Sequence, residues 1–168
     1  LFNSQIAGID ECDLCLLIGS NPKIEASILN SRIRKRYLNS DNKIIIGYVG
    51  ENIELNYKFQ NLGESPSILK QILDGSHQFS KYLKKSKKPM IILGQGALSR
   101  DDSEEIFFAS RSIYEKYSND SNWSGFNVLQ TFAGRAGAYD VNFFKGFNNK
   151  YNSNFMKSID SSNIDILI

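Results

Sequence analysis

The sequence predicts an α/β domain built on a parallel β-sheet. Short apolar runs end at small polar residues and alternate with longer segments whose apolar residues recur every three or four positions. The clearest run spans residues 14–18 and reads Leu-Cys-Leu-Leu-Ile, as expected of a strand buried on both faces. Strands that alternate with helices favour a parallel sheet covered by helices on both sides.

Length and composition limit the class of protein. The 168 residues fit one domain, and a hydrophobic fraction of 41% is typical of a globular chain. A net charge of +2 argues against a nucleic-acid partner. No apolar run approaches the roughly 20 residues that span a bilayer, so we expect membrane association only through partner proteins.

The first half of the chain supplies two predicted strands and their connections. A short helical or turn segment over 2–11 precedes the strand at 14–18, and a helix over 23–38 follows it with Leu29, Ile33 and Tyr37 on one face. Residues 43–49 are rich in β-branched side chains and predict a second strand. Residues 51–63 show no clear period and predict a surface excursion.

Turn and capping residues place the next segments. Ser65 is expected to cap a helix with Pro66 at its first position, and Gly75 to end it, with Ser76 capping a further helix. Residues 89–93 predict a third strand. The expected apolar faces are Ile68, Ile72 and Leu73 in the first helix, Phe79, Tyr82 and Leu83 in the second, and Ile106, Ala109, Ile113 and Tyr117 in a helix after residue 101.

The last quarter of the chain predicts an unfinished sheet. A fourth strand over 126–129, a helix over 131–139 and an irregular segment over 142–154 lead to a fifth strand over 164–168. Because no segment follows to cover that strand, we interpret 1–168 as a single domain, incomplete at the C-terminus, that belongs to something larger. Expressed alone, it is expected to be poorly soluble or loosely folded.

Two turns lie where phosphate-binding loops occur. Gly19, Ser20 and Asn21 follow one strand, and Gly94 and Gly96 follow another, each just before a helix. The third glycine of the dinucleotide fingerprint is replaced by serine in the second turn, so tight turns without ligand are the favoured interpretation.

Other candidate chemistry is sparse. Cys12 and Cys15 have C-x-x-C spacing, but a metal or iron–sulfur site needs two more ligands, and only His77 is available besides carboxylates. Residues three apart in a strand point to opposite faces, so two structural cysteines in a reducing compartment are favoured. His77 is expected at the surface, as are the basic runs 32–36 and 81–88, whose alternative use is docking of an acidic partner.

Four stretches together carry a family resemblance. They are residues 1–11, Ile18-Gly19-Ser20-Asn21-Pro22 with Glu25-Ala26 and Asn30-Ser31-Arg32-Ile33-Arg34-Lys35, Leu62-Gly63-Glu64-Ser65-Pro66 continuing through Ile68-Leu69, and Gly75-Ser76-His77-Gln78-Phe79 continuing to Gly94. This order resembles the molybdopterin-oxidoreductase-type domain in the large iron–sulfur subunit of respiratory complex I. Beyond Leu98 the likeness is thinner, with Asn127-Val128-Leu129 in the expected place.

The resemblance implies a Rossmann-like parallel sheet and a former cofactor site that no longer binds a cofactor. In molybdenum enzymes of the superfamily such turns hold a pterin guanine dinucleotide, whereas the complex I branch carries no molybdenum cofactor. Its iron–sulfur clusters are bound by cysteine-rich motifs in the N-terminal part of the subunit, which this chain lacks. Gly19, Ser20, Asn21, Gly94 and Gly96 are therefore expected to be vestigial at most, with no catalytic, cofactor-binding or metal residue in this chain.

The resemblance also implies a function and a cellular location. We expect a non-catalytic domain that supports electron transfer from NADH to ubiquinone in the matrix arm, at the matrix side of the mitochondrial inner membrane or the cytoplasmic side in bacteria. Its expected partners are other complex I subunits, above all the cluster-bearing portion of the same subunit. The alternatives are a fragment of a molybdopterin-dependent oxidoreductase that binds pterin guanine dinucleotide, and a free-standing nucleotide-binding module.

Overall fold

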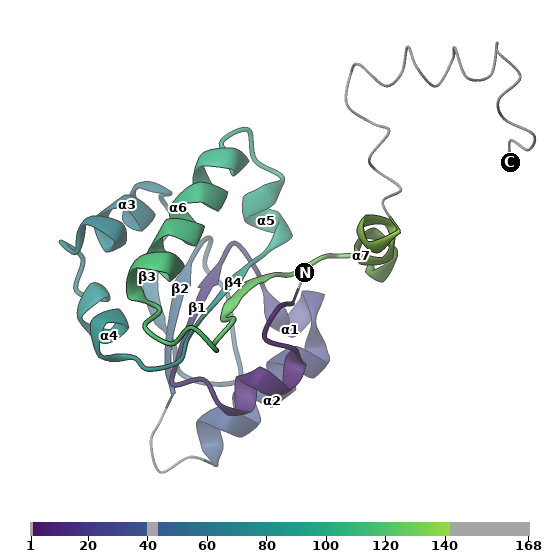
Figure 1. Ribbon diagram of the computed structural model, residues 1–168, viewed down its shortest axis with the longest axis horizontal. Helices are drawn as coiled ribbons and strands as arrows, with labels where there is room; N and C mark the ends of the chain where they lie inside the picture. Colours follow the sequence, from purple (N-terminus) through teal and green to yellow (C-terminus); the bar gives the residue numbers. More distant parts are fainter. Residues whose placement is uncertain (1, 40–43, 142–168) are drawn as a thin grey trace, which may run out of the picture. The chain divides into compact units, whose positions relative to one another are not determined.

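A computed structural model describes residues 2–39 and 44–141 of the chain. They fall into two units, one covering 1–131 and one that begins at Phe132, and each is described separately. The first unit holds one five-stranded sheet in the order β3-β2-β1-β4-β5, with every pair parallel, which confirms the predicted fold class (Figure 1). The strands are β1 (Leu14–Ile18), β2 (Ile45–Val49), β3 (Gln60–Gly63), β4 (Pro89–Leu93) and β5 (Phe126–Val128).

The two central strands explain why the apolar runs are continuous. In β1, Leu14, Leu16 and Ile18 join the apolar cluster on one face of the sheet, whereas Cys15 and Leu17 join the cluster on the other. The same alternation occurs in β4, whose five residues are all buried. Side chains of a strand point to the two faces in turn, so a strand covered on both sides must be apolar throughout.

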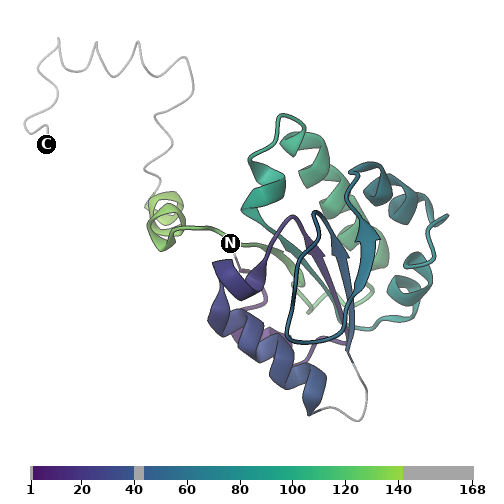
Figure 2. The same ribbon diagram turned by 180° about the vertical axis from the view of Figure 1, so that it is seen from behind.

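Helices cover both faces of this sheet (Figures 1 and 2). One face packs against α3 (Ser67–Asp74), α4 (Ser80–Lys85), α5 (Gln95–Leu98) and α6 (Ser103–Tyr117). The other packs against α2 (Ser27–Leu38) and the 3-10 helix η1 (Ile6–Asp10), with α1 (Pro22–Glu25) leading into α2. The strand order and the helices on both faces together form a doubly wound sheet.

Two segments differ from the sequence prediction. The helix expected over 23–38 is broken at Ala26, whose backbone lies outside the helical region (φ −151°, ψ 68°), so that α1 and α2 are separate helices. The expected surface excursion over 51–63 contains β3, a short edge strand whose residues are exposed or half-buried. An exposed edge strand lacks the apolar period that marks a strand in a sequence.

The capping predictions are partly confirmed. Gly75 ends α3 in the left-handed region (φ 88°), where glycine is favoured, and Ser65 Oγ accepts the backbone N–H of Ser67 (3.3 Å). Pro66 occupies the cap position rather than the first turn, a shift of one residue. The capping role of Ser76 is wrong, because its hydroxyl donates back to the Gln71 carbonyl of α3 (3.2 Å).

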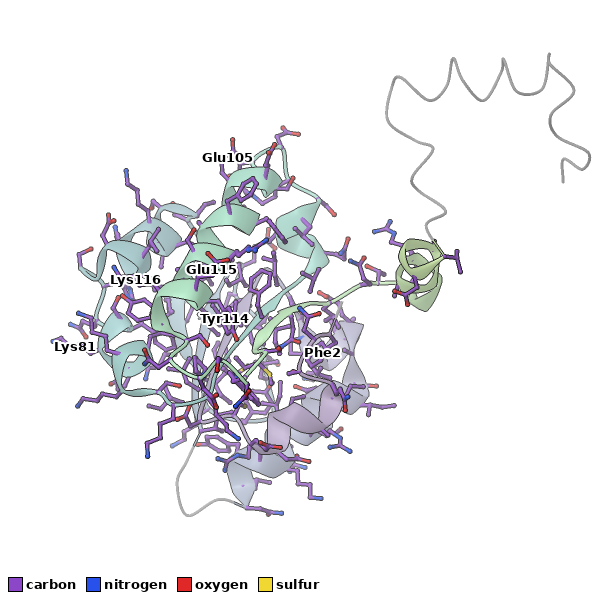
Figure 3. All side chains as sticks on the ribbon, viewed as in Figure 1. Phe2, Lys81, Glu105, Tyr114, Glu115 and Lys116 are labelled. Atoms are coloured by element: carbon purple, nitrogen blue, oxygen red, sulfur yellow. The ribbon has the colours of Figure 1, made fainter. Side chains whose placement is uncertain are left out.

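The N-terminal segment lies along the outer edge of β5. Phe2 forms an antiparallel bridge with Asn127, and the Asn127 carboxamide oxygen accepts hydrogen bonds from the Ser4 N–H (3.0 Å) and hydroxyl (3.2 Å). Tyr114 reaches from α6 to the start of the same strand, where its hydroxyl accepts the Gly125 N–H (2.9 Å) (Figure 3). Asn127 is fully buried, so these bonds fix the first residues of the chain on this edge.

The second unit contains α7 (Ala133–Asp140), which agrees with the helix predicted over 131–139. The irregular segment 142–154 and the strand predicted over 164–168 lie outside the described residues, and a single domain over 1–168 remains a prediction. None of the helices within residues 2–39 and 44–141 combines the length and apolar character that crossing a bilayer requires.

Candidate functional site

The turn after β1 binds a carboxylate that the chain itself supplies from the next helix. Gly19 adopts a left-handed conformation (φ 55°) and donates its N–H to the Val49 carbonyl (2.9 Å). In the next helix, the carboxylate of Glu25 accepts the Asn21 N–H (2.9 Å) and the Ser20 hydroxyl (3.2 Å). Two donors of this turn therefore already bind an anion that the chain supplies.

The turn after β4 lies directly against the turn after β1. Gly94 donates its N–H to the Ile18 carbonyl (2.8 Å), and α5 begins at the next residue. A Cβ atom placed on Gly94 would lie 2.3 Å from the Cβ atom of Ser20 and 2.5 Å from the carbonyl oxygen of Gly19. The structure thus brings the predicted site residues together at the switch point of the strand order, where ligands bind in doubly wound sheets.

A cavity opens beside these turns, at the carboxyl ends of β1 and β2. Its volume is about 430 Å³, within the range of small-molecule sites. Three exposed carboxylates line it, and we call it the acidic cavity. Its lining comprises Ile18, Gly19, Ser20, Asn21, Glu25, Tyr48, Val49, Gly50, Glu51, Asn52, Ile53, Glu64, Pro66, Leu69, Gly96, Ala97, Arg100 and Ile106.

The electrostatics of the acidic cavity are dominated by negative charge. Burial, followed by the charges of Glu51, Glu25 and Glu64, raises the pKa of the Tyr48 hydroxyl. The one cation of the lining, Arg100, forms a bidentate ion pair with Asp102 through bonds of 2.6 and 2.9 Å. That pairing lowers the pKa of the Asp102 carboxyl, so its negative charge is retained and offsets the arginine.

These residues do not fit the pyrophosphate of a pterin guanine dinucleotide. A pyrophosphate needs free backbone donors, space above the glycines and a positive or neutral environment. Here the space above Gly94 is filled by Gly19 and Ser20, the Asn21 donor binds Glu25, and three carboxylates line the adjoining cavity. The glycines serve close packing between two turns.

The cysteines occupy a different place from the one predicted. Cys12 precedes β1 and is not part of it, and both thiols are buried in the same apolar cluster on one side of the sheet. The inference that they point to opposite faces is therefore wrong, whereas their structural role agrees with their burial. Burial raises the pKa of the Cys12 thiol to about 12 and raises that of Cys15 well above its usual value, so both remain neutral.

The other candidate residues are held in local structure. His77 is half-buried, and its Nδ1 accepts the Phe79 N–H (3.1 Å) at the start of α4. In the basic runs, Arg32 pairs with Asp10 (2.8 Å) and Lys88 pairs with Glu11 (2.5 Å), while Lys81 is exposed (Figure 3). Across residues 2–39 and 44–141, no three His, Cys, Asp or Glu side chains are placed to hold a metal ion.

Sequence reasoning missed the residues that give the cavity its character. Glu25 follows Asn21 by four positions, one more than the capping-box spacing, so no sequence motif marks its return to the turn. Tyr48 and Glu51 flank the end of β2 and Glu64 follows β3, so all three lie at the carboxyl edge of the sheet. The β3 strand was not predicted, and without it Glu64 has no place at that edge.

Proteins with similar sequences are subunits of NADH-ubiquinone and NADH-quinone oxidoreductases. At 45% identity over 141 residues, the chain resembles the NADH-ubiquinone oxidoreductase 75 kDa subunit of Reclinomonas americana, with 83% of this chain and 20% of that protein covered. It is 40% identical over 148 residues to the mitochondrial NADH-ubiquinone oxidoreductase 78 kDa subunit of Neurospora crassa, covering 85% and 19% respectively. A bacterial NADH-quinone oxidoreductase chain, from Rickettsia bellii, is 40% identical over 144 residues, covering 85% and 21%. The chain thus spans about a fifth of the length of these relatives.

A solved structure supports the fold alone. A chain of the formyltransferase/hydrolase complex from Methylorubrum extorquens, determined with methylofuran, aligns with a TM-score of 0.51 and 14% identity over 82% of this chain and 42% of that chain. The sequence profile of molybdopterin oxidoreductases matches residues 1–166, nearly the full length. With its parallel doubly wound sheet and this match, the chain belongs to the molybdopterin oxidoreductase family.

Proposed function

We propose that the chain is a non-catalytic α/β portion of the large iron–sulfur subunit of respiratory complex I. The observation that carries this proposal is the 45% identity over 141 residues to a NADH-ubiquinone oxidoreductase 75 kDa subunit. In this role the chain supports transfer of electrons from NADH to ubiquinone without handling electrons itself. The iron–sulfur clusters would lie on the N-terminal part of the subunit or on a partner chain.

The geometry of the described residues supports a non-catalytic role. The turns Gly19-Ser20-Asn21 and Gly94-Gln95-Gly96 pack against each other, and a carboxylate of the chain accepts the donors of the first turn. Both thiols are buried in an apolar cluster, where cysteines serve packing. The alternative, a pterin-binding fragment, would need a neutral or positive cavity.

The proposed partners and location follow from the same relatives. We infer assembly with other subunits of complex I, above all the cluster-bearing part of the large subunit, and no binding of nucleic acid. The location would be the matrix side of the mitochondrial inner membrane, or the cytoplasmic side in bacteria, with membrane association through the assembled complex.

Isolation of the tagged chain from its source tests this proposal. The chain should co-migrate on a native gel with NADH-oxidising activity and with other oxidoreductase subunits. After separation from its partners, it should contain neither iron nor molybdenum, and mass spectrometry should detect no pterin. A chain that runs free of the NADH-oxidising band, or that retains stoichiometric molybdopterin, would contradict the proposal.

A substitution in the first turn tests the non-catalytic role within the assembly. Asn21→Ala should leave the rate of NADH–quinone electron transfer per assembled complex unchanged, because no reacting group touches this turn in the proposal. A fall in that rate at normal assembly would argue that the turn serves the chemistry.

A further inference from the structure

We propose that the acidic cavity binds an arginine side chain presented by a partner protein segment. The partner would belong to the assembly proposed above, so this inference rests on the proposed function for the identity of the partner. The recognition chemistry itself stands on the residues of this chain, because it follows from the charges, free polar groups and apolar walls of the cavity.

The charge of the cavity selects a cation. Glu25, Glu51 and Glu64 are all exposed at its rim and come from three separate segments that follow β1, β2 and β3. Arg100 does not offset them, because Asp102 neutralises it. The cavity is therefore strongly negative in a chain whose net charge is +2, and charge complementarity favours a basic partner.

Two polar groups of the cavity, the Tyr48 hydroxyl and the Asn21 carboxamide oxygen, have no hydrogen-bond partner among the described residues. Tyr48 is only 3% exposed and lines the cavity, and its hydroxyl has no hydrogen bond to any described residue. Its ring is held edge-on against Phe59 at 5.9 Å between centroids. The Asn21 carboxamide oxygen in the same lining is buried without a donor. A buried polar group is almost always hydrogen-bonded, so the Asn21 oxygen points to a donor from outside, and the Tyr48 hydroxyl, which remains accessible from the cavity, can bond to the same group.

The rest of the lining suits a side chain with an alkyl stem. Ile18, Val49 and Leu69 are buried apolar residues of the wall, against which methylene groups pack. The carboxylates are not gathered closely enough for a metal ion within the described residues. A guanidinium group offers five N–H donors spread over a plane, which matches carboxylates, a hydroxyl and an amide oxygen better than a point charge does.

The surface beside the cavity favours a protein over a free small molecule. Ile24, next to Glu25 in the sequence, is 79% exposed, and Ile28 is 74% exposed. An exposed isoleucine one residue from a lining carboxylate offers a partner protein an apolar contact next to the charged one. The chain also spans only about a fifth of its relatives, so most of such a subunit lies outside it and is available to supply the arginine.

Binding of n-butylguanidinium to the full 168-residue chain tests the recognition chemistry. We expect saturable shifts in the amide NMR signals of Gly19, Gly50 and Ala97 at low salt, with none for the neutral n-butylurea. Tyr48→Phe should weaken binding by about two- to tenfold through loss of one hydrogen bond. Glu51→Gln should weaken it by about two- to fivefold. Glu115→Gln, on the solvent side of α6 and outside the cavity, is the matched control and should leave binding unchanged.

Three results would overturn the proposal. Equal shifts with n-butylurea would indicate an apolar site without charge selection, and saturable shifts with Mg²⁺ that displace the guanidinium would indicate a metal site. The absence of any amide shift on addition of n-butylguanidinium would show that the cavity does not bind a guanidinium group.

The assembly test separates this inference from the proposed function. Glu51→Arg should reduce recovery of partner subunits with the tagged chain severalfold without changing the melting temperature of the chain. Unchanged recovery would refute the arginine contact while leaving the proposed function intact. If the wild-type chain recovers no oxidoreductase subunits, the proposed function fails irrespective of n-butylguanidinium binding.

Discussion

Gly94→Ala probes whether the glycines of the two turns serve packing or a ligand. The backbone of Gly94 has φ −100°, which any residue adopts, so the effect of an added methyl group comes from crowding alone. That methyl group would lie 2.3 Å from Ser20 Cβ and 2.5 Å from the Gly19 carbonyl oxygen, and the latter belongs to the backbone. Overpacking costs about 1–3 kcal/mol, and the stiffer unfolded chain returns about 0.4–1 kcal/mol. Because backbone atoms cannot rotate away, we expect a net loss of about 2 kcal/mol.

Urea unfolding of the full chain measures this loss through the fluorescence of Trp123, the only tryptophan and 8% exposed. A loss of about 2 kcal/mol also lowers the melting temperature by about 4–8 °C for a chain of this size. Gly134→Ala is the control, because its added Cβ would meet no atom within 4 Å apart from its chain neighbours and its own helix backbone, so its urea midpoint should not fall below that of the wild type. Ser20→Gly in the Gly94→Ala background removes the nearest atom and should restore part of the loss, giving a coupling energy in a double-mutant cycle.

The reasoning fails if Gly94→Ala unfolds at the wild-type urea concentration. A glycine that cradles a phosphate has open space above it, so alanine there would cost ligand affinity and leave the stability of the free chain almost unchanged. A stability loss without any ligand is the signature of turn-on-turn packing.

Three further predictions concern polar groups that are buried or half-buried. Because burial raises the pKa of Cys12 from 9.0 to about 12 and raises that of Cys15, both thiols stay neutral when folded but ionise above pH 9 when unfolded, so stability should fall as pH rises above 9. The slope in urea unfolding should approach about 2.7 kcal/mol per pH unit for the two thiols and about 1.4 in Cys12→Ala, and a flat profile would contradict the burial. Asp13→Ala should cost about 2–3 kcal/mol in urea unfolding, since the Asp13 carboxylate accepts the N–H groups of Lys87 (2.7 Å) and Lys88 (3.1 Å) and the Ser86 hydroxyl. A loss below about 0.5 kcal/mol, as for an ordinary surface residue, would refute this. Asn127→Leu should raise hydrogen exchange at the Ser4 amide by about tenfold because it removes the acceptor of that N–H, and unchanged protection would show that other contacts hold the segment.

The central strands and their helices were predictable because burial of a strand on both faces requires an unbroken run of apolar residues in the sequence. The runs at β1 and β4 are wholly apolar, and Gly75 is the residue that a left-handed helix end favours. These features follow from local chemistry and need no knowledge of the partner segment.

Other features depended on contacts distant in the sequence. The strand β3 is a Gln-Asn-Leu-Gly segment at an exposed edge, with no β-branched residue to mark it. The break at Ala26 has neither glycine nor proline beside it, and the return of Glu25 to Ser20 and Asn21 is visible only in three dimensions. Cys12 and Cys15 share one cluster because Cys12 lies before the strand, so alternation within a strand did not apply to the pair.

At the carboxyl edge of the sheet, the fold favours a phosphate ligand and the charge favours a cation. The charge determines which of the two can bind. Strand order fixes a switch point between β1 and β4 in any doubly wound sheet, irrespective of what binds there. In this chain Gly94 and Ser20 fill that point, while the neighbouring space at the carboxyl ends of β1 and β2 stays open and is lined by Glu25, Glu51 and Glu64. A phosphate would meet repulsion from three carboxylates, whereas a guanidinium would satisfy them together with the Tyr48 hydroxyl. A family member that kept a pterin dinucleotide here would therefore need a turn free of the Gly94–Ser20 contact and an uncharged or basic residue in place of Glu25.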